Sequence, residues 1–228
     1  MNRKTKPLFF LFVIVSIAEI ILISTGNETL RIFTKPLIIP FLAGIYHLNA
    51  ISPPKKNYKD PVLLGLFFSW IGDILLQNEG YFIPGLMAFL IAHIFYILFF
   101  ASTQSANTSF FKLRPVMIIA VIAYLIELMI LLWPHLGGMK IPVLVYGITI
   151  STMLSAAFWQ YQKLDNTTSL YLIFGAGFFV ASDSILALNK FKTQFDSAGI
   201  YIMSTYILAQ LFIVLGAIRY RNIPQEQQ

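Results

Sequence analysis

Long apolar runs follow one another along the chain, and only short polar segments separate them. A helix that crosses a bilayer needs roughly 17–25 mostly apolar residues. Runs of this length predict eight transmembrane helices, at residues 7–24, 33–49, 61–77, 81–101, 114–133, 140–160, 169–189 and 199–218. The pattern therefore predicts an all-α integral membrane bundle in a single domain over residues 1–220, followed by a disordered C-terminal tail over residues 221–228.

The composition favours the same class of protein. Hydrophobic residues make up 57% of the 228 positions and charged residues only 11%, whereas a soluble globular chain carries roughly 25% charged residues. The chain contains no cysteine, which excludes disulfides, thiolate catalysis and cysteine-ligated metals.

The basic residues set the expected orientation. The formal net charge is +6, and Lys and Arg concentrate in the cytoplasmic loops of membrane proteins. With the N-terminus in the cytoplasm, 11 of the 16 Lys and Arg residues fall on the cytoplasmic side of the eight predicted spans. We therefore expect both termini to be cytoplasmic, and we interpret the positive charge as a topological signal and not as a nucleic-acid-binding surface.

The polar residues that interrupt the spans occur in the same order in the two halves of the chain. The first half has Glu19, Lys35, Asp73 and Ala92-His93-Ile94-Phe95, and the second half has Glu127, Lys140, Asp183 and Ala209-Gln210-Leu211-Phe212. Four spans in each half would make the repeats parallel, related by an axis along the membrane normal. We expect a four-plus-four internal repeat, against the alternative that apolar helices resemble one another by chance.

Ionisable residues inside the spans are the candidates for a functional site, because each costs roughly 2.5–3.5 kcal/mol to insert. The rise of 1.5 Å per residue places several of them in one layer, about 5–10 Å below the outer surface. The residues expected in or near this layer are Asp73, Asp183, Glu19, Glu127, Lys35 and Tyr206. The pattern predicts a polar pocket in the outer half of the bilayer, lined by carboxylates from four helices.

Some of these residues also fit a purely structural role. Glu19 and Glu127 suit interhelical hydrogen bonds, and Lys35 is long enough to snorkel to the interface. His93, expected about halfway across its span, suits a core histidine bonded to a neighbour as well as a ligand contact.

Asp73 and Asp183 are the strongest candidates for chemistry, since their short side chains cannot snorkel and both have small neighbours. In a partly dry cavity, one of two carboxyl groups can hold a proton while the other stays ionised. This is what hydrolysis through an oxocarbenium ion requires: one acid donates a proton, and the other carboxylate stabilises the cation or activates water. His47 and His135 lie near opposite faces, so we expect no metal site, and the scheme requires no cofactor.

Four segments resemble motifs of the YhhN/TMEM86 family of membrane proteins. Phe67-Phe68-Ser69-Trp70-Ile71-Gly72-Asp73-Ile74-Leu75-Leu76 is similar to the family's Gly-Asp-x-x-Leu motif, and Ala92-His93-Ile94-Phe95-Tyr96 is similar to the motif in its next span. Thr34-Lys35-Pro36-Leu37 looks like its Lys-Pro-Leu motif, and residues 175–189, with Ser182-Asp183-Ser184 and Asn189, look like its seventh-span signature. The resemblance covers the chain from about residue 10 to residue 218.

The resemblance implies lysoplasmalogenase activity, the hydrolysis of the vinyl ether bond of lysoplasmalogens to a fatty aldehyde and a glycerophospho-base. Asp73 and Asp183 would then be catalytic, and Lys35 would contact the phosphate of a lysophospholipid. The residues expected to bind the substrate are Lys35, Glu19, His93, Tyr96, Glu127, Asn189 and Tyr206. We expect a multi-pass protein of a bacterial cytoplasmic (inner) membrane, in contact with membrane lipids, of an oligomeric state that the sequence leaves open.

A transporter or binding protein is the main alternative, because a parallel repeat and polar residues inside the spans suit transport too. Transporters usually break helices near the substrate site. The prolines at positions 36, 61, 84 and 142 lie near the predicted span ends, and we expect span interiors without proline, which disfavours transport. A structural or assembly protein would explain the basic loops but not two carboxylates at one depth.

Overall fold

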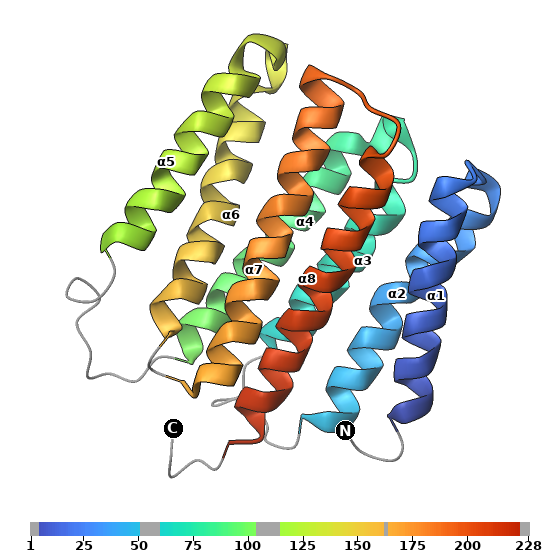
Figure 1. Ribbon diagram of the computed structural model, residues 1–228, viewed down its shortest axis with the longest axis vertical. Helices are drawn as coiled ribbons and strands as arrows, with labels where there is room; N and C mark the ends of the chain where they lie inside the picture. The colour runs from blue at the N-terminus through green and yellow to red at the C-terminus, as the bar shows by residue number, and fades with distance from the viewer. Residues whose placement is uncertain (1–4, 51–59, 104–114, 162–163, 224–228) are drawn as a thin grey trace.

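A computed structural model describes residues 5–50, 60–103, 115–161 and 164–223, and these residues form eight α-helices without a strand (Figure 1). The helices are α1 (Lys6–Ser24), α2 (Glu28–Asn49), α3 (Pro61–Leu75), α4 (Phe82–Ser102), α5 (Pro115–Leu132), α6 (Lys140–Gln160), α7 (Asn166–Ala187) and α8 (Ala198–Arg221). The predicted all-α bundle is confirmed. Helix α8 continues to Arg221, and residues 224–228 of the predicted tail lie outside the described residues.

Seven of the helices in the described part of the chain are long and apolar enough to cross a membrane, and α3 is the exception. With 15 residues, α3 reaches only about 22 Å, against a hydrocarbon core of about 30 Å. The predicted span 61–77 is therefore too long, because the helix ends at Leu75, two residues after Asp73. Large apolar side chains project from the outside of the bundle, as a lipid-facing surface requires: Phe10, Phe33, Val116, Ile130 and Ile141.

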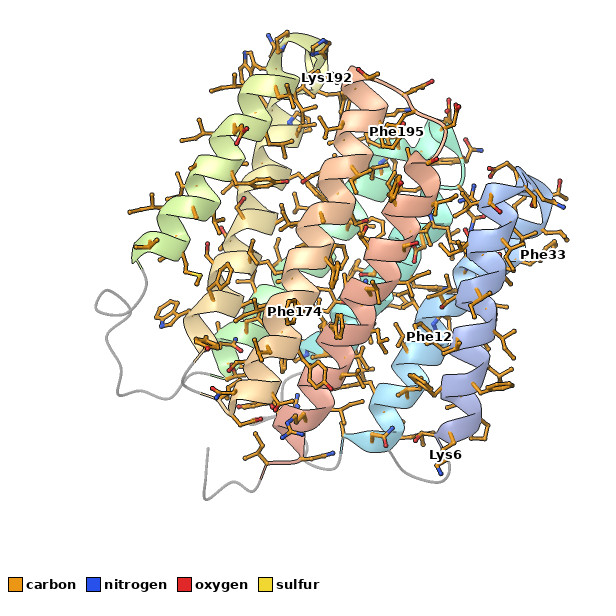
Figure 2. All side chains as sticks on the ribbon, viewed as in Figure 1. Lys6, Phe12, Phe33, Phe174, Lys192 and Phe195 are labelled. Atoms are coloured by element: carbon orange, nitrogen blue, oxygen red, sulfur yellow. The ribbon has the colours of Figure 1, made fainter. Side chains whose placement is uncertain are left out.

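Four pairs of consecutive helices pack side by side and antiparallel: α1 with α2, α3 with α4, α5 with α6, and α7 with α8 (Figure 1). Helices α5 and α6 form one edge of the bundle, and α1 and α2 form the opposite edge. Helix α1 begins and α8 ends at one end of the bundle, which we call the terminal end (Figure 1). Lys6 lies at this end and Lys192 at the other, the distal end (Figure 2). The cytoplasmic location of the terminal end stays a prediction. Several of the Lys and Arg residues on which that prediction depends lie outside the described residues.

The contacts between helices have a corresponding order in the two halves. Helix α2 packs against α3 as α6 packs against α7, and α4 packs against α6 as α8 packs against α2. A parallel four-plus-four arrangement requires these contacts. They support the predicted repeat, which stays a prediction.

Helix α5 is set apart from the main apolar core. That core is built from side chains of the other seven helices. Helix α5 belongs to a smaller cluster that lies where α5 ends and α6 begins, made of Met129, Leu132, Leu136 and Val143. The distal half of α5 is therefore the part that packs most firmly on its neighbours.

Two arginines at the end of α8 hold the starts of two other helices at the terminal end. Asp60 caps α3 by accepting a hydrogen bond from the backbone amide of Val62, and Arg221 Nη2 lies 3.2 Å from its carboxylate. Asp165 caps α7 in the same way, and Arg219 Nε lies 3.1 Å from its carboxylate. A capping carboxylate is stabilising at a helix N-terminus, and here each one also ties its helix to α8.

Candidate active site

Asp73 lies near the end of α3, in the distal half of the bundle, and its side chain is only 2% exposed. The hydroxyl of Tyr206 on α8 donates a hydrogen bond to Asp73 Oδ2 at 2.6 Å. The ammonium of Lys35 on α2 lies 3.7 Å from Asp73 Oδ1. The buried carboxyl group therefore has a hydrogen-bond donor and a cation, each from a different helix.

Two further buried side chains extend these contacts toward α4. Gln210 Nε2 donates to the hydroxyl oxygen of Tyr206 at 3.4 Å, and Gln210 Oε1 accepts a hydrogen bond from the hydroxyl of Tyr96 at 2.7 Å. Hydrogen bonds in such a chain polarise one another in a dry interior. The chain from Tyr96 to Tyr206 thus orients the hydroxyl that faces Asp73.

Asp183 lies near the end of α7 in an environment of a different kind. The hydroxyl of Tyr146 on α6 donates a hydrogen bond to Asp183 Oδ2 at 2.6 Å, and Nε2 of His93 on α4 lies 3.7 Å from the same oxygen. The Asp183 side chain is 15% exposed. It is therefore the more accessible of the two aspartates, and its neighbours are a phenol and an imidazole.

The two aspartates have partners from corresponding helices. Asp73 contacts α2 of its own half through Lys35 and α8 of the other half through Tyr206. Asp183 contacts α6 of its own half through Tyr146 and α4 of the other half through His93. The two polar clusters therefore draw on corresponding helices of the predicted repeat, but both partner side chains differ: a lysine and a tyrosine beside Asp73, and a tyrosine and a histidine beside Asp183.

A buried phenylalanine connects the two clusters. The ring of Phe179 on α7 lies 4.5 Å from the ring of His93 and 5.6 Å from the ring of Tyr206, measured between centroids. Phe89 on α4 packs against Phe179 and Tyr206 as well. The structure thus brings the partners of both aspartates against one apolar side chain, which was not expected from the sequence.

The other expected site residues lie elsewhere. Glu19 is buried, but it accepts hydrogen bonds from Arg31 Nε at 3.1 Å and Thr34 Oγ1 at 2.6 Å, so it ties α1 to α2. Glu127 is exposed on α5, so the expectation that it lines the pocket is not met. Asn189 lies in the π-helical turn after α7 and accepts a hydrogen bond from the amide of Phe195.

Helix α2 corrects the expectation that span interiors lack proline, because Pro36 and Pro40 both lie inside it. Proline has no N–H, so Pro40 cannot donate to the carbonyl of Pro36, four residues earlier. The indole N–H of Trp70 on α3 donates to this carbonyl instead, at 2.9 Å. The bond joins α2 to α3 beside Lys35 and one helical turn before Asp73, and so helps to fix the distance between these two side chains.

Replacing Trp70 with phenylalanine is expected to lower the free energy of unfolding by about 1–3 kcal/mol, the cost of leaving a partly buried carbonyl inside a membrane helix without a donor. Thermal unfolding in detergent measures this loss. Pro40→Ala supplies an N–H for the Pro36 carbonyl, so Trp70→Phe should be less harmful in a Pro40→Ala background. An equal loss in both backgrounds would show that the carbonyl bond does not matter.

Sequence reasoning missed Tyr146 and Trp70 and used Gln210 only as a marker of the repeat. One feature of the sequence could have pointed to Tyr146: it is a tyrosine inside an apolar span, about two turns from the predicted outer end of that span, as Tyr206 is.

Among the residues that the structure describes, no three His, Asp or Glu side chains gather closely enough to hold a metal ion. The arrangement offers two carboxyl groups, each held by a tyrosine hydroxyl, for proton transfer and for charge stabilisation in a dry interior.

Comparison with known proteins identifies relatives across most of the chain. Lysoplasmalogenase TMEM86A of Homo sapiens is 34% identical over 173 residues, which are 71% of this chain and 66% of the relative, or just under two thirds of its length. Lysoplasmalogenase TMEM86B of Homo sapiens is 30% identical over 170 residues, which are 74% of this chain and 68% of the relative.

A bacterial relative extends the match. The lysoplasmalogenase of Mycobacterium tuberculosis (strain CDC 1551 / Oshkosh) is 29% identical over 207 residues, which are 88% of this chain and 75% of the relative. No solved structure matches the chain significantly. The YhhN family matches residues 30–217, which include all of α3 to α7, most of α2 and α8, and both aspartates. The chain therefore belongs to the YhhN family.

Proposed function

We propose that this chain is a membrane-embedded lysoplasmalogenase that hydrolyses the vinyl ether bond of a lysophospholipid. The observation that carries the proposal is the pair of intramembrane aspartates, each hydrogen-bonded by a tyrosine hydroxyl. Relatives named lysoplasmalogenase support the substrate class. A carboxyl group inside the bilayer is costly and marks a functional site by default.

In the proposed reaction, Asp183 donates a proton to the vinyl ether carbon that is not bonded to oxygen. The electron pair of the double bond forms the new C–H bond, and the neighbouring carbon becomes an oxocarbenium ion. Water adds to that carbon and returns a proton to Asp183, which gives a hemiacetal. The hemiacetal then loses its alcohol, releasing a fatty aldehyde and a glycerophospho-base.

The different surroundings of the aspartates support this division of roles. Asp183 is the more exposed group, and a phenol and an imidazole lie within reach of it. Asp73 is held against the ammonium of Lys35, so we propose that it remains a carboxylate. Phe179 contacts His93, a partner of Asp183, and Tyr206, a partner of Asp73. In this proposal Asp183 touches the substrate directly, and Asp73 stabilises the oxocarbenium ion electrostatically from the neighbouring cluster. Fixed charges of this kind act strongly where water is excluded.

The test is incubation of the purified protein with an alkenyl lysophospholipid, followed by mass spectrometry. The expected products are aldehyde and glycerophospho-base in equal amounts, and in deuterium oxide the aldehyde should carry one deuterium on the carbon next to its carbonyl. The saturated alkyl ether analogue, which cannot be protonated on carbon, is the control and should stay intact. An unchanged alkenyl lipid would overturn the proposal and favour transport, which lipid movement across proteoliposomes would then measure.

A further inference from the structure

An apolar groove runs along the bundle between α5, α6 and α7, with a volume of about 340 Å³. This volume lies within the range of about 300–1,000 Å³ that is usual for small-molecule sites. The residues that define its course are Met117 and Tyr124 of α5, Leu154 and Phe158 of α6, and Gly177 and Ala181 of α7. The groove follows the part of α5 that lies outside its firm distal contact with α6.

A polar pair lies at the distal end of the groove, one residue along α7 from Asp183. The hydroxyl of Tyr124, which lines the groove, donates a hydrogen bond to Ser184 Oγ at 2.5 Å. Ser184 directly follows Asp183 in α7. From this pair the lining continues seven residues along each helix, to Met117 on α5 and to Gly177 on α7, which corresponds to a length of about 10 Å.

We propose that this groove binds the alkenyl chain of the single-chain lipid and places its first carbons beside Asp183. The inference rests on the proposed function for the identity of the lipid. An apolar groove whose lining on α7 reaches Ala181, two residues before the proposed proton donor, suits a molecule whose reactive bond directly precedes a long hydrocarbon chain. The chain enters from the bilayer and not from water, so its packing against the walls of the groove, and not hydrophobic transfer, stabilises binding. The length of the groove therefore sets the preferred chain length.

Small side chains on α7 create the space. An added Cβ at Gly177 would meet no atom within 4 Å, so a larger residue there projects into the groove without displacing the protein. A second apolar groove, of about 290 Å³, lies between α2 and α3. Its lining includes Trp70, whose indole N–H is already used by Pro36, and its lining side chains come from α2 and α3 and not from α7, the helix that carries Asp183. This second groove, which also holds Ala43, provides a matched control.

Gly177→Leu is expected to change the chain-length preference. The ratio of kcat/KM for a hexadecenyl over an octenyl lysoplasmalogen should fall by about tenfold or more, since one methylene in a tight apolar pocket is worth roughly 10–200-fold. Ala43→Leu narrows the other groove and should leave this ratio unchanged. An unchanged ratio in Gly177→Leu, or an equal change in both variants, would overturn the proposed chain site.

Photolabelling tests the same site without turnover. The probe is a saturated alkyl ether lysophospholipid with a diazirine near the end of its chain, and the protein is the wild type in lipid nanodiscs. Labels should concentrate on the groove-lining peptides of α5 and α7, decrease with excess unlabelled probe lipid lacking the diazirine, and decrease in Gly177→Leu but not in Ala43→Leu. Labels spread evenly over the lipid-facing helices, or concentrated between α2 and α3, would overturn the chain site. Absence of aldehyde release by the wild type would instead count against the proposed function alone.

Discussion

Aldehyde release should fall about 100- to 10,000-fold when Asp183 is replaced by asparagine, the usual range for loss of a general acid. Asparagine keeps the size of the side chain and still accepts the hydrogen bond that Tyr146 donates at 2.6 Å. It cannot donate a proton to carbon at a useful rate, so the loss should appear in kcat. Mass spectrometry of the released aldehyde measures the loss, and thermal unfolding in detergent checks that the variant is folded.

Asp196 provides the matched control for this substitution. It lies in the segment between α7 and α8, and its side chain is exposed. Asp196→Asn makes the same chemical change at the same end of the bundle and should leave aldehyde release unchanged. Full turnover by a folded Asp183→Asn variant would remove Asp183 from the mechanism.

Asp73→Asn should lower kcat about 100- to 1,000-fold with little change in KM, as expected for a group that stabilises charge mainly in the transition state. The substitution removes the carboxylate that faces the ammonium of Lys35 at 3.7 Å. Steady-state kinetics of aldehyde release with the purified variant measures the two constants separately. A raised KM with an unchanged kcat would assign Asp73 to ground-state binding.

A double-variant cycle then tests whether Lys35 acts through Asp73. If the ammonium serves to hold the Asp73 carboxylate, Lys35→Met combined with Asp73→Asn should lose no more activity than the worse single variant. Losses that multiply would give Lys35 an independent role, such as the phosphate contact expected from the sequence. Both outcomes are read from the same aldehyde assay.

The sequence encodes depth in the membrane more clearly than direction around each helix. Apolar runs of spanning length place each helix along the chain to within a few residues, and the rise per residue converts position into depth. Asp73, Asp183, Lys35 and Tyr206 were expected at one level on this basis, and the structure brings them into two neighbouring clusters. Glu127 was expected at the same level but lies on the exposed face of α5. An almost wholly apolar helix has no polar stripe, so its sequence does not show which side faces the other helices and which side faces the lipid.

Individual side-chain contacts between neighbouring helices were equally hard to predict. Tyr146 reaches Asp183 because α6 packs beside α7, and Trp70 bonds to Pro36 because Pro40 has no N–H. The second of these follows from local chemistry, since a proline inside a helix frees a carbonyl that needs a donor. The identity of the donor depends on how α2 and α3 are rotated against each other, which the order of residues does not reveal.

The last helix completes polar contacts that were left open by helices made earlier. Tyr206, Arg219 and Arg221 of α8 supply partners to Asp73, Asp165 and Asp60. During synthesis, the N-terminal segments leave the ribosome first, so those three carboxylates enter the nascent bundle before their partners exist. A chain arrested before α8 would lack these three partners, and Asp73 would keep only Lys35 and Asp60 only Tyr46 and the start of α3. The segment that is synthesised last is therefore the one that completes these polar contacts, so the bundle reaches its full set of interhelical bonds only when the whole chain has been made.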